Sequence, residues 1–191
     1  MKSDAKMSAK TLALGAILTA LVVILQFMGS FIHLGMFSIS LVLIPIVIGA
    51  AMCGKFIGAW LGFVFGVVVL ISGDAAAFLA INIPGTILTV LLKGTLCGLF
   101  AGLVYDLLAK KNKYLGVLAA AIVCPIVNTG IFLLGCLVFF MPTITSWAGG
   151  SNIVSFMIFG LGLINFPVEL AFNLILSPVI VRLLNISKRL G

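Results

Sequence analysis

The chain has 191 residues, of which 63% are hydrophobic and 8% are charged, and its mean hydropathy is +1.41. A soluble domain of this length needs far more charge to cover its surface, so the composition excludes a soluble globular protein. The formal net charge of +7 lies in short segments and at the termini, without a basic stripe interleaved with aromatic residues. This placement argues against nucleic-acid binding.

Apolar runs follow one another along the whole chain, and each is long enough to form a membrane-spanning helix. About 20 apolar residues cross the hydrocarbon core, and a backbone in lipid must satisfy its own hydrogen bonds. The sequence therefore predicts an all-α integral membrane protein, with six transmembrane helices in one compact bundle and a single domain over residues 1–191. The predicted spans are residues 8–28, 36–52, 56–72, 84–108, 114–140 and 153–184.

The first predicted span carries small residues and ends near two polar ones. No small-residue cleavage site follows it, so it is interpreted as a retained helix rather than a signal peptide. Ala16 and Ala20 fit packing inside the bundle and docking to another membrane subunit equally well. Gln26 and His33 could line the mouth of a site near the outer end of this span, although His33 fits an ordinary solvated loop residue as well.

The third and fourth spans carry glycines at every fourth position, which places each row on one helical face. We interpret these rows as surfaces where two helix backbones pack closely in lipid. Asp74, in the loop between the two spans, is interpreted as a solvated loop acid. The rows consist of Gly54, Gly58, Gly62 and Gly66 on one span and Gly94, Gly98 and Gly102 on the other.

A few polar side chains stand at membrane depth, where they are costly without a partner or a purpose. Lys93 lies about 13 Å from the outer end of the fourth span and shares a helical face with Thr89. Asn128 lies midway along the fifth span. On the sixth span, Asn165, Glu169 and Asn173 share a face because they are spaced by four residues.

These groups would converge if the spans pack around one pocket, and such a pocket suits a small polar ligand with apolar walls. The alternative is a buried ion pair between Lys93 and Glu169 with a structural role alone. The sequence leaves both interpretations open.

The inventory of reactive side chains argues against an enzyme. A single histidine excludes the multi-histidine metal sites of intramembrane metalloproteases, and the common nucleophile and phosphate-binding motifs are missing from the sequence. The cysteines lack a Cys-x-x-Cys pair and are interpreted as packing residues, so no metal and no cofactor is predicted. They are Cys53, Cys97, Cys124 and Cys136.

Positive charges define the expected orientation. The loops at residues 29–35, 73–83 and 141–152 contain no Lys or Arg, whereas the termini and the loops near residues 55 and 112 are basic. By the positive-inside rule, the basic side and both termini are expected to be cytoplasmic.

Several segments together resemble one family, the substrate-binding S components of energy-coupling factor (ECF) vitamin transporters. The similar segments are residues 14–21 (LGAILTAL), 38–50 (SISLVLIPIVIGA), 93–105 (KGTLCGLFAGLVY), 125–129 (PIVNT) and 165–169 (NFPVE). The resemblance covers nearly the whole chain.

This resemblance implies a subunit of the bacterial plasma membrane that binds a scarce micronutrient outside the cell. The micronutrient would be delivered through a transmembrane coupling subunit and two ATPases. The resemblance also implies that Ala16 and Ala20 face the coupling subunit, and that the binding site includes Thr89, Lys93, Asn128, Asn165 and Glu169.

Pantothenate is the vitamin that the sequence favours, because a buried lysine would complement its carboxylate and the chain resembles that branch. Riboflavin or another vitamin is the alternative. A different class stays open as well: a small channel or proton-coupled carrier that works without an ATPase, with Lys93 and Glu169 as relay groups.

Overall fold

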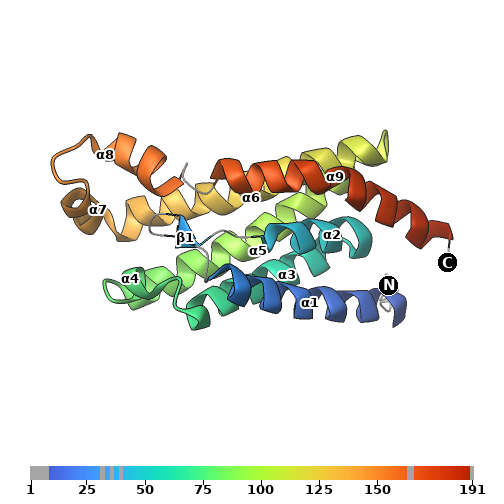
Figure 1. Cartoon of the computed structure of the whole chain (residues 1–191), viewed down its shortest axis with the longest axis horizontal. Coiled ribbons are helices and arrows are strands. Elements are labelled where there is room, and N and C mark those ends of the chain that lie inside the picture. Colours follow the sequence, from blue (N-terminus) through green and yellow to red (C-terminus); the bar gives the residue numbers. More distant parts are fainter. Residues whose placement is uncertain (1–8, 31–32, 35–36, 39–40, 163–165, 190–191) are drawn as a thin grey trace, which may run out of the picture.

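A computed structural model describes residues 9–30, 33–34, 37–38, 41–162 and 166–189, which form an elongated bundle of helices with one short hairpin (Figure 1). The elements in chain order are α1 (Ala9–Gly29), β1 (His33–Leu34), β2 (Phe37–Ser38), α2 (Leu43–Cys53), α3 (Lys55–Ser72), α4 (Ala76–Leu79), α5 (Ile83–Leu108), α6 (Lys113–Phe139), α7 (Met141–Trp147), α8 (Ile153–Ser155), the π-helix η1 (Phe156–Gly162) and α9 (Phe166–Arg189).

Within the described residues, five segments are long and apolar enough to cross a membrane: α1, α3, α5, α6 and the segment 153–186. The bounds of α1, α3, α5 and α6 lie within one residue of the spans expected from the sequence. The last segment was expected as a single span over residues 153–184, kinked at Pro167 and Pro178. It instead contains α8, η1 and α9.

The second expected span, residues 36–52, is not confirmed as a helix that crosses the membrane. The helix observed there, α2, begins at Leu43 and has 11 residues, which gives a length of about 17 Å against a hydrocarbon core of about 30 Å. Upstream of α2, Phe37–Ser38 pairs with His33–Leu34 in an antiparallel hairpin. Pro45 explains the late start, because proline is tolerated in the first turn of a helix but disrupts its interior.

Local capping groups fix where the two longest helices begin. The side chain of Asn82 accepts a hydrogen bond from the backbone nitrogen of Gly85 at 2.9 Å and so caps α5. Asn112 accepts one from the backbone nitrogen of Tyr114 at 2.8 Å and caps α6 in the same way. At the other end of the α3–α5 connection, Gly73 adopts a φ of +91° and ends α3.

Most of the predicted glycine rows pack within the bundle, α3 against α5, whereas Gly54 precedes α3 and a Cβ there would have nothing within 4 Å. A Cβ atom at Gly58 would lie 2.6 Å from the backbone oxygen of Gly98, and one at Gly62 would lie against the backbone of Gly94. Since no side chain separates them, α3 and α5 touch backbone to backbone along their length. This contact brings the face of α5 that carries Lys93 close to α3. It also fixes how deep Lys93 lies in the bundle.

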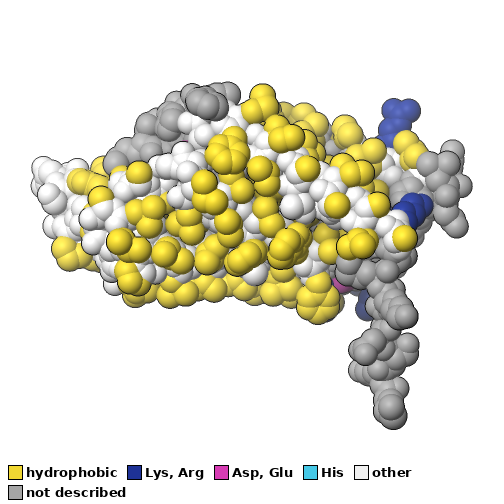
Figure 2. Space-filling model, turned by 90° about the horizontal axis from the view of Figure 1, so that it is seen from below, with side chains coloured by type: hydrophobic (Ala, Val, Ile, Leu, Met, Phe, Trp, Pro, Cys, Tyr) yellow, Lys and Arg dark blue, Asp and Glu magenta, His cyan; other side chains and the backbone are white. Residues whose placement is uncertain are grey.

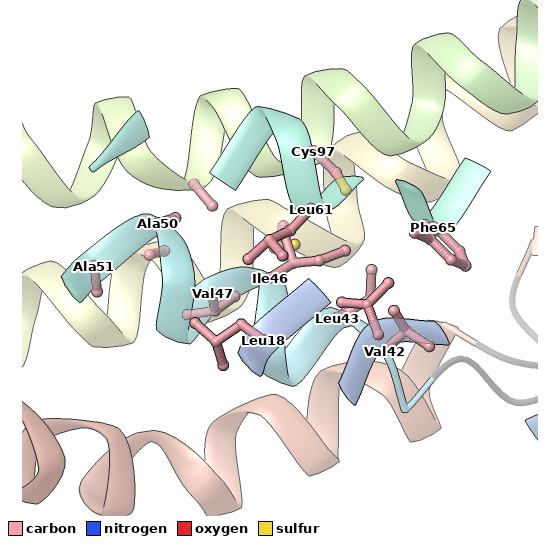
Figure 3. Packing of buried hydrophobic residues seen from close by; sticks show 14 of the residues in the cluster. Leu18, Val42, Leu43, Ile46, Val47, Ala50, Ala51, Leu61, Phe65 and Cys97 are labelled. Atoms are coloured by element: carbon pink, nitrogen blue, oxygen red, sulfur yellow. The ribbon is translucent and has the colours of Figure 1, made fainter. Parts of the chain in front are cut away.

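A buried hydrophobic cluster joins α2 to its neighbours on the side of the bundle near the chain termini. Figure 3 shows Ile46 and Leu43 of α2 beside Leu61 of α3 and Leu18 of α1. The buried residues Ile180 and Leu184 of α9 belong to the same cluster. Cys97, Cys124 and Cys136 are fully buried, as expected of packing residues.

Hydrophobic side chains also cover much of the outside of the bundle. Phe56, Val138 and Ile175 are each at least 70% exposed, on three different helices. Figure 2 shows hydrophobic side chains across the visible face, while Lys and Arg gather at the end that holds the chain termini in Figure 1. An apolar exterior of this extent is typical of a protein whose surroundings are lipid.

Candidate ligand cavity

A cavity of about 80 Å³ lies inside the half of the bundle that contains α4 and the start of α9. A cavity of 10–15 Å³ already holds one water, so this one has room for several water-sized groups. Its polar lining residues are Gln26, Asp74, Thr86, Thr89, Lys93, Asn128, Thr129 and Glu169. Its apolar lining residues are Val69, Ala75, Phe78, Val90, Phe132, Phe140, Leu161 and Gly162.

Five of the residues that were predicted from the sequence to bind a ligand line this cavity, and they come from four different helices. They are Gln26, Thr89, Lys93, Asn128 and Glu169. Asn165 falls within residues 163–165, outside the described residues, and the side chain of His33 is likewise outside them. That the five residues bind a ligand stays a prediction; their convergence is a property of the structure.

Lys93 provides the cation of the cavity. Its Nζ atom lies 5.4 Å from the ring centroid of Phe65 on α3 and 5.6 Å from that of Phe132 on α6. Aromatic faces attract an ammonium group, and the attraction is strongest where water is excluded. Glu169 and Asp74, whose carboxylates attract an ammonium group, line the same cavity. Lys93 is therefore held between two rings and shares the cavity with two acids.

Asp74 is a cavity residue that the sequence analysis assigned to solvent. The carboxylate is half-buried, and its Oδ2 atom accepts hydrogen bonds from Nε2 of Gln26 at 2.5 Å and from Oγ of Ser72 at 3.2 Å. Gln26 is itself 2% exposed and belongs to α1. The sequence around Asp74 did not predict this hydrogen bond, because its partner Gln26 is 48 residues away.

Two polar atoms on the cavity wall have no hydrogen-bond partner among the described residues. They are Oγ1 of Thr89 and Oδ1 of Asn128, and both side chains are 5% exposed. Buried polar atoms are nearly always paired, and an unpaired one costs about 1–3 kcal/mol. By contrast, Thr86 donates from Oγ1 to the backbone oxygen of Asn82 at 2.7 Å. The first two atoms therefore mark where a bound molecule or water would be accommodated.

Glu169 stands in the first turn of α9, where the helix dipole favours a negative charge. Its side chain is 4% exposed. One turn later, Nδ2 of Asn173 donates to the backbone oxygen of Glu169 at 2.9 Å. Asn173 is also buried but does not line the cavity, so of these two polar groups on α9 only Glu169 faces the space.

Aromatic rings form part of the cavity wall. Phe78 of α4 packs edge-to-face on Phe132 of α6, with ring centroids 5.6 Å apart, and on Phe140, with centroids 4.9 Å apart. These three rings line the cavity and belong to a second buried cluster that includes Ile144 and Met157. Edge-to-face packing gives this wall a defined shape.

The two alanines expected either inside the bundle or at a partner surface lie on the outside. Ala16 and Ala20 are exposed on α1, on the face opposite the buried residues Leu18 and Val22. Ile17, between them in sequence, is 65% exposed. Packing inside this chain therefore does not explain the two alanines.

A comparison with known protein families matches residues 10–181 to the family described as "ECF transporter, substrate-specific component". This match covers most of the chain. The protein belongs to the substrate-specific components of ECF transporters.

The fold of this S component agrees with that of a solved structure described as ThiT from Listeria monocytogenes. The two chains superpose with a TM-score of 0.69 over 91% of this chain and 94% of the other, at 21% sequence identity. At this identity the likeness concerns the fold alone. The sequence has no match among curated proteins.

Membership in this family settles two broad points about the S component. It is a membrane protein of a transport system, and its part in that system is to bind substrate rather than to catalyse a reaction. The comparisons do not extend to the pantothenate branch, which stays a prediction.

Proposed function

We propose that this chain is the high-affinity binding subunit for uptake of a small water-soluble vitamin or vitamin precursor. The observation that carries the proposal is the cavity itself, where polar side chains from four long helices meet inside an apolar bundle. A few convergent polar groups with apolar walls are typical of a small-molecule site. The unpaired atoms of Thr89 and Asn128 give such a molecule specific places to bind.

The proposed orientation opens this site to the outside of the cell. Lys and Arg side chains gather at the end of the bundle that holds the chain termini (Figures 1 and 2), and the exposed basic residues include Lys10, Lys110, Lys111 and Arg182. Under the positive-inside rule that end is cytoplasmic, together with both termini. The cavity half, with α4 and α7, then faces the exterior, where a scarce nutrient is captured.

The exposed face of α1 is the proposed surface for the coupling subunit. Ala16 and Ala20 leave room on it for close approach of another helix, and small residues favour such packing in lipid. Two ATPases bound to that coupling subunit would provide the energy for delivery. This arrangement assigns binding to the present chain and ATP hydrolysis to its partners.

For the substrate, pantothenate is the candidate that the sequence favours, since Lys93 would bind its carboxylate. Riboflavin or another vitamin is the alternative. Two carboxylates, Asp74 and Glu169, line the same cavity and would repel an anion. A vitamin panel is therefore part of the test.

Uptake into proteoliposomes tests the proposed function. The purified chain would be reconstituted alone, with a complete ECF module and ATP, and with the module but without ATP. Each preparation would be offered radiolabelled vitamins. We expect concentrative uptake of one vitamin only when the module and ATP are both present. Concentrative uptake by the chain alone would instead support a proton-coupled carrier, and equilibrating uptake by the chain alone would support a channel; either result would contradict the proposal.

A further inference from the structure

The acidic residues of this chain are distributed very unevenly. The whole sequence has only four, and two of them, Asp74 and Glu169, line the cavity, where Lys93 is the one basic residue of the described lining. Residues 31–40 and 163–165, which lie outside the described residues or whose side chains do, contain no Asp, Glu, Lys or Arg, and their only titratable side chain is His33. The formal charge of the lining is therefore negative.

Lys93 shares the cavity with both acids, Glu169 and Asp74, so that one formal positive charge accompanies two formal negative charges. One ammonium group compensates at most one of the two carboxylates. One formal negative charge of the described lining is then left uncompensated. A half-buried carboxylate such as that of Asp74 is favoured by a positive charge nearby.

The hydrogen bonds of Asp74 leave one side of its carboxylate open. Gln26 and Ser72 both donate to Oδ2, and no hydrogen bond to Oδ1 is found among the described residues. The two donors are neutral, so they orient the carboxylate without cancelling its charge. This geometry holds an acceptor oxygen in a fixed direction at the cavity wall.

Two further polar atoms of the cavity wall need hydrogen-bond donors. Oδ1 of Asn128 and Oγ1 of Thr89 are buried and unpaired, and both can accept a hydrogen bond. The ring of Phe78, four residues after Asp74, lies on the same cavity. Aromatic faces attract positive charge. An acid, two open acceptors and an aromatic wall all favour the same kind of ligand group.

We propose that the ligand carries a positively charged nitrogen, and that Asp74 is the residue that selects it. This inference rests on the proposed function and deepens it. The proposed substrate is then a cationic vitamin rather than an anionic one. Its amine, pyridinium or similar cation binds near Asp74, and the rest of the molecule reaches toward Lys93.

Equilibrium binding to the purified chain tests the inference. The probes are thiamine and pyridoxamine, which carry a positive nitrogen, pantothenate, an anion, and riboflavin, which is neutral. The variants are wild type, Asp74→Asn and Asp106→Asn. Asp74→Asn keeps an oxygen acceptor for Gln26 but removes the charge. Asp106 is exposed in the last turn of α5, far along the helix from the cavity, and serves as the matched control.

We expect a cationic probe to bind wild type and the Asp106→Asn variant equally, and to bind the Asp74→Asn variant at least tenfold more weakly. Unliganded thermal stability would be measured for each variant, so that loss of affinity is separated from loss of fold. Tight binding of pantothenate or riboflavin, undiminished in the Asp74→Asn variant, would overturn the inference and leave the proposed function intact. Failure of every probe to bind wild type would overturn both.

Discussion

Gln26 on α1 donates a 2.5 Å hydrogen bond to Asp74 in the turn between α3 and α4. The bond joins two parts of the chain at the cavity wall, and it places a buried amide behind a half-buried carboxylate. Gln26 therefore has two roles that can be separated, one in holding α1 against the turn and one in aiming Asp74.

Replacing Gln26 with leucine, which has nearly the same size, removes the donor without opening a void. We expect affinity for the transported solute to fall about tenfold, because Asp74 loses its orientation and a hydrogen bond to a charged group contributes about 1.5–3 kcal/mol. Binding calorimetry on the purified variant measures the change. Unaltered affinity would show that Asp74 is positioned by other contacts.

The presence of Lys93, Glu169 and Asp74 on one cavity predicts a charge-compensation effect. Lys93→Met should lower the free energy of unfolding by about 1–3 kcal/mol, less than for a fully buried pair because Lys93 is half-buried. The double variant Lys93→Met/Glu169→Gln should recover much of that loss, since it removes the acid left uncompensated. Thermal unfolding in detergent compares the three proteins. A double variant no more stable than Lys93→Met would mean that the two charges are not coupled.

The α3–α5 contact predicts a sharp difference between two glycines. Gly62→Ala should destabilise the protein by about 1–3 kcal/mol, because its Cβ meets the backbone of Gly94, which cannot move aside cheaply. Gly130→Ala on α6 is the control, since a Cβ there has nothing within 4 Å. Alanine is the better helix former, so this control should be neutral or slightly stabilising. Equal melting temperatures for the two variants would contradict the close-packed contact.

The exposed alanines of α1 predict a variant that binds but does not transport. Ala16→Trp combined with Ala20→Trp should leave vitamin binding by the isolated chain unchanged. In proteoliposomes with the ECF module, the same variant should lose most uptake, because the bulky rings prevent close approach of another helix. Ile175→Trp, at an apolar position of α9 that is 71% exposed, is the control. Normal uptake by the alanine variant would remove this face from the partner surface.

Hydrophobic runs and residue spacing predicted much of this architecture. The bounds of α1, α3, α5 and α6 follow from apolar length, and the α3–α5 contact follows from glycines every fourth residue. The start of α2 was misjudged because apolar composition alone does not distinguish a helix from the extended segment at Phe37–Ser38. Pro45 was the available signal for a helix start near Leu43.

The polar residues of the cavity were predictable in part. Thr89, Lys93, Asn128 and Glu169 stand out because polar groups at membrane depth are rare. Asp74 was not predicted as a cavity residue, since an acid beside Gly73 in a loop is typical of a solvent-exposed position. Its role depends on where α1 ends relative to α3, a tertiary relationship that periodicity within a single helix does not contain.

Native mass spectrometry of the purified chain tests the central claim most directly, that this cavity binds a small solute. The measurement compares wild type with Asn128→Leu, which removes a buried acceptor from the wall at nearly constant side-chain size. Both proteins would be incubated with the same vitamin panel. The account predicts a one-to-one complex with one vitamin for wild type and a strongly reduced complex for the variant. If wild type bound none of the vitamins, or if wild type and the variant formed equal amounts of the complex, the account would be contradicted.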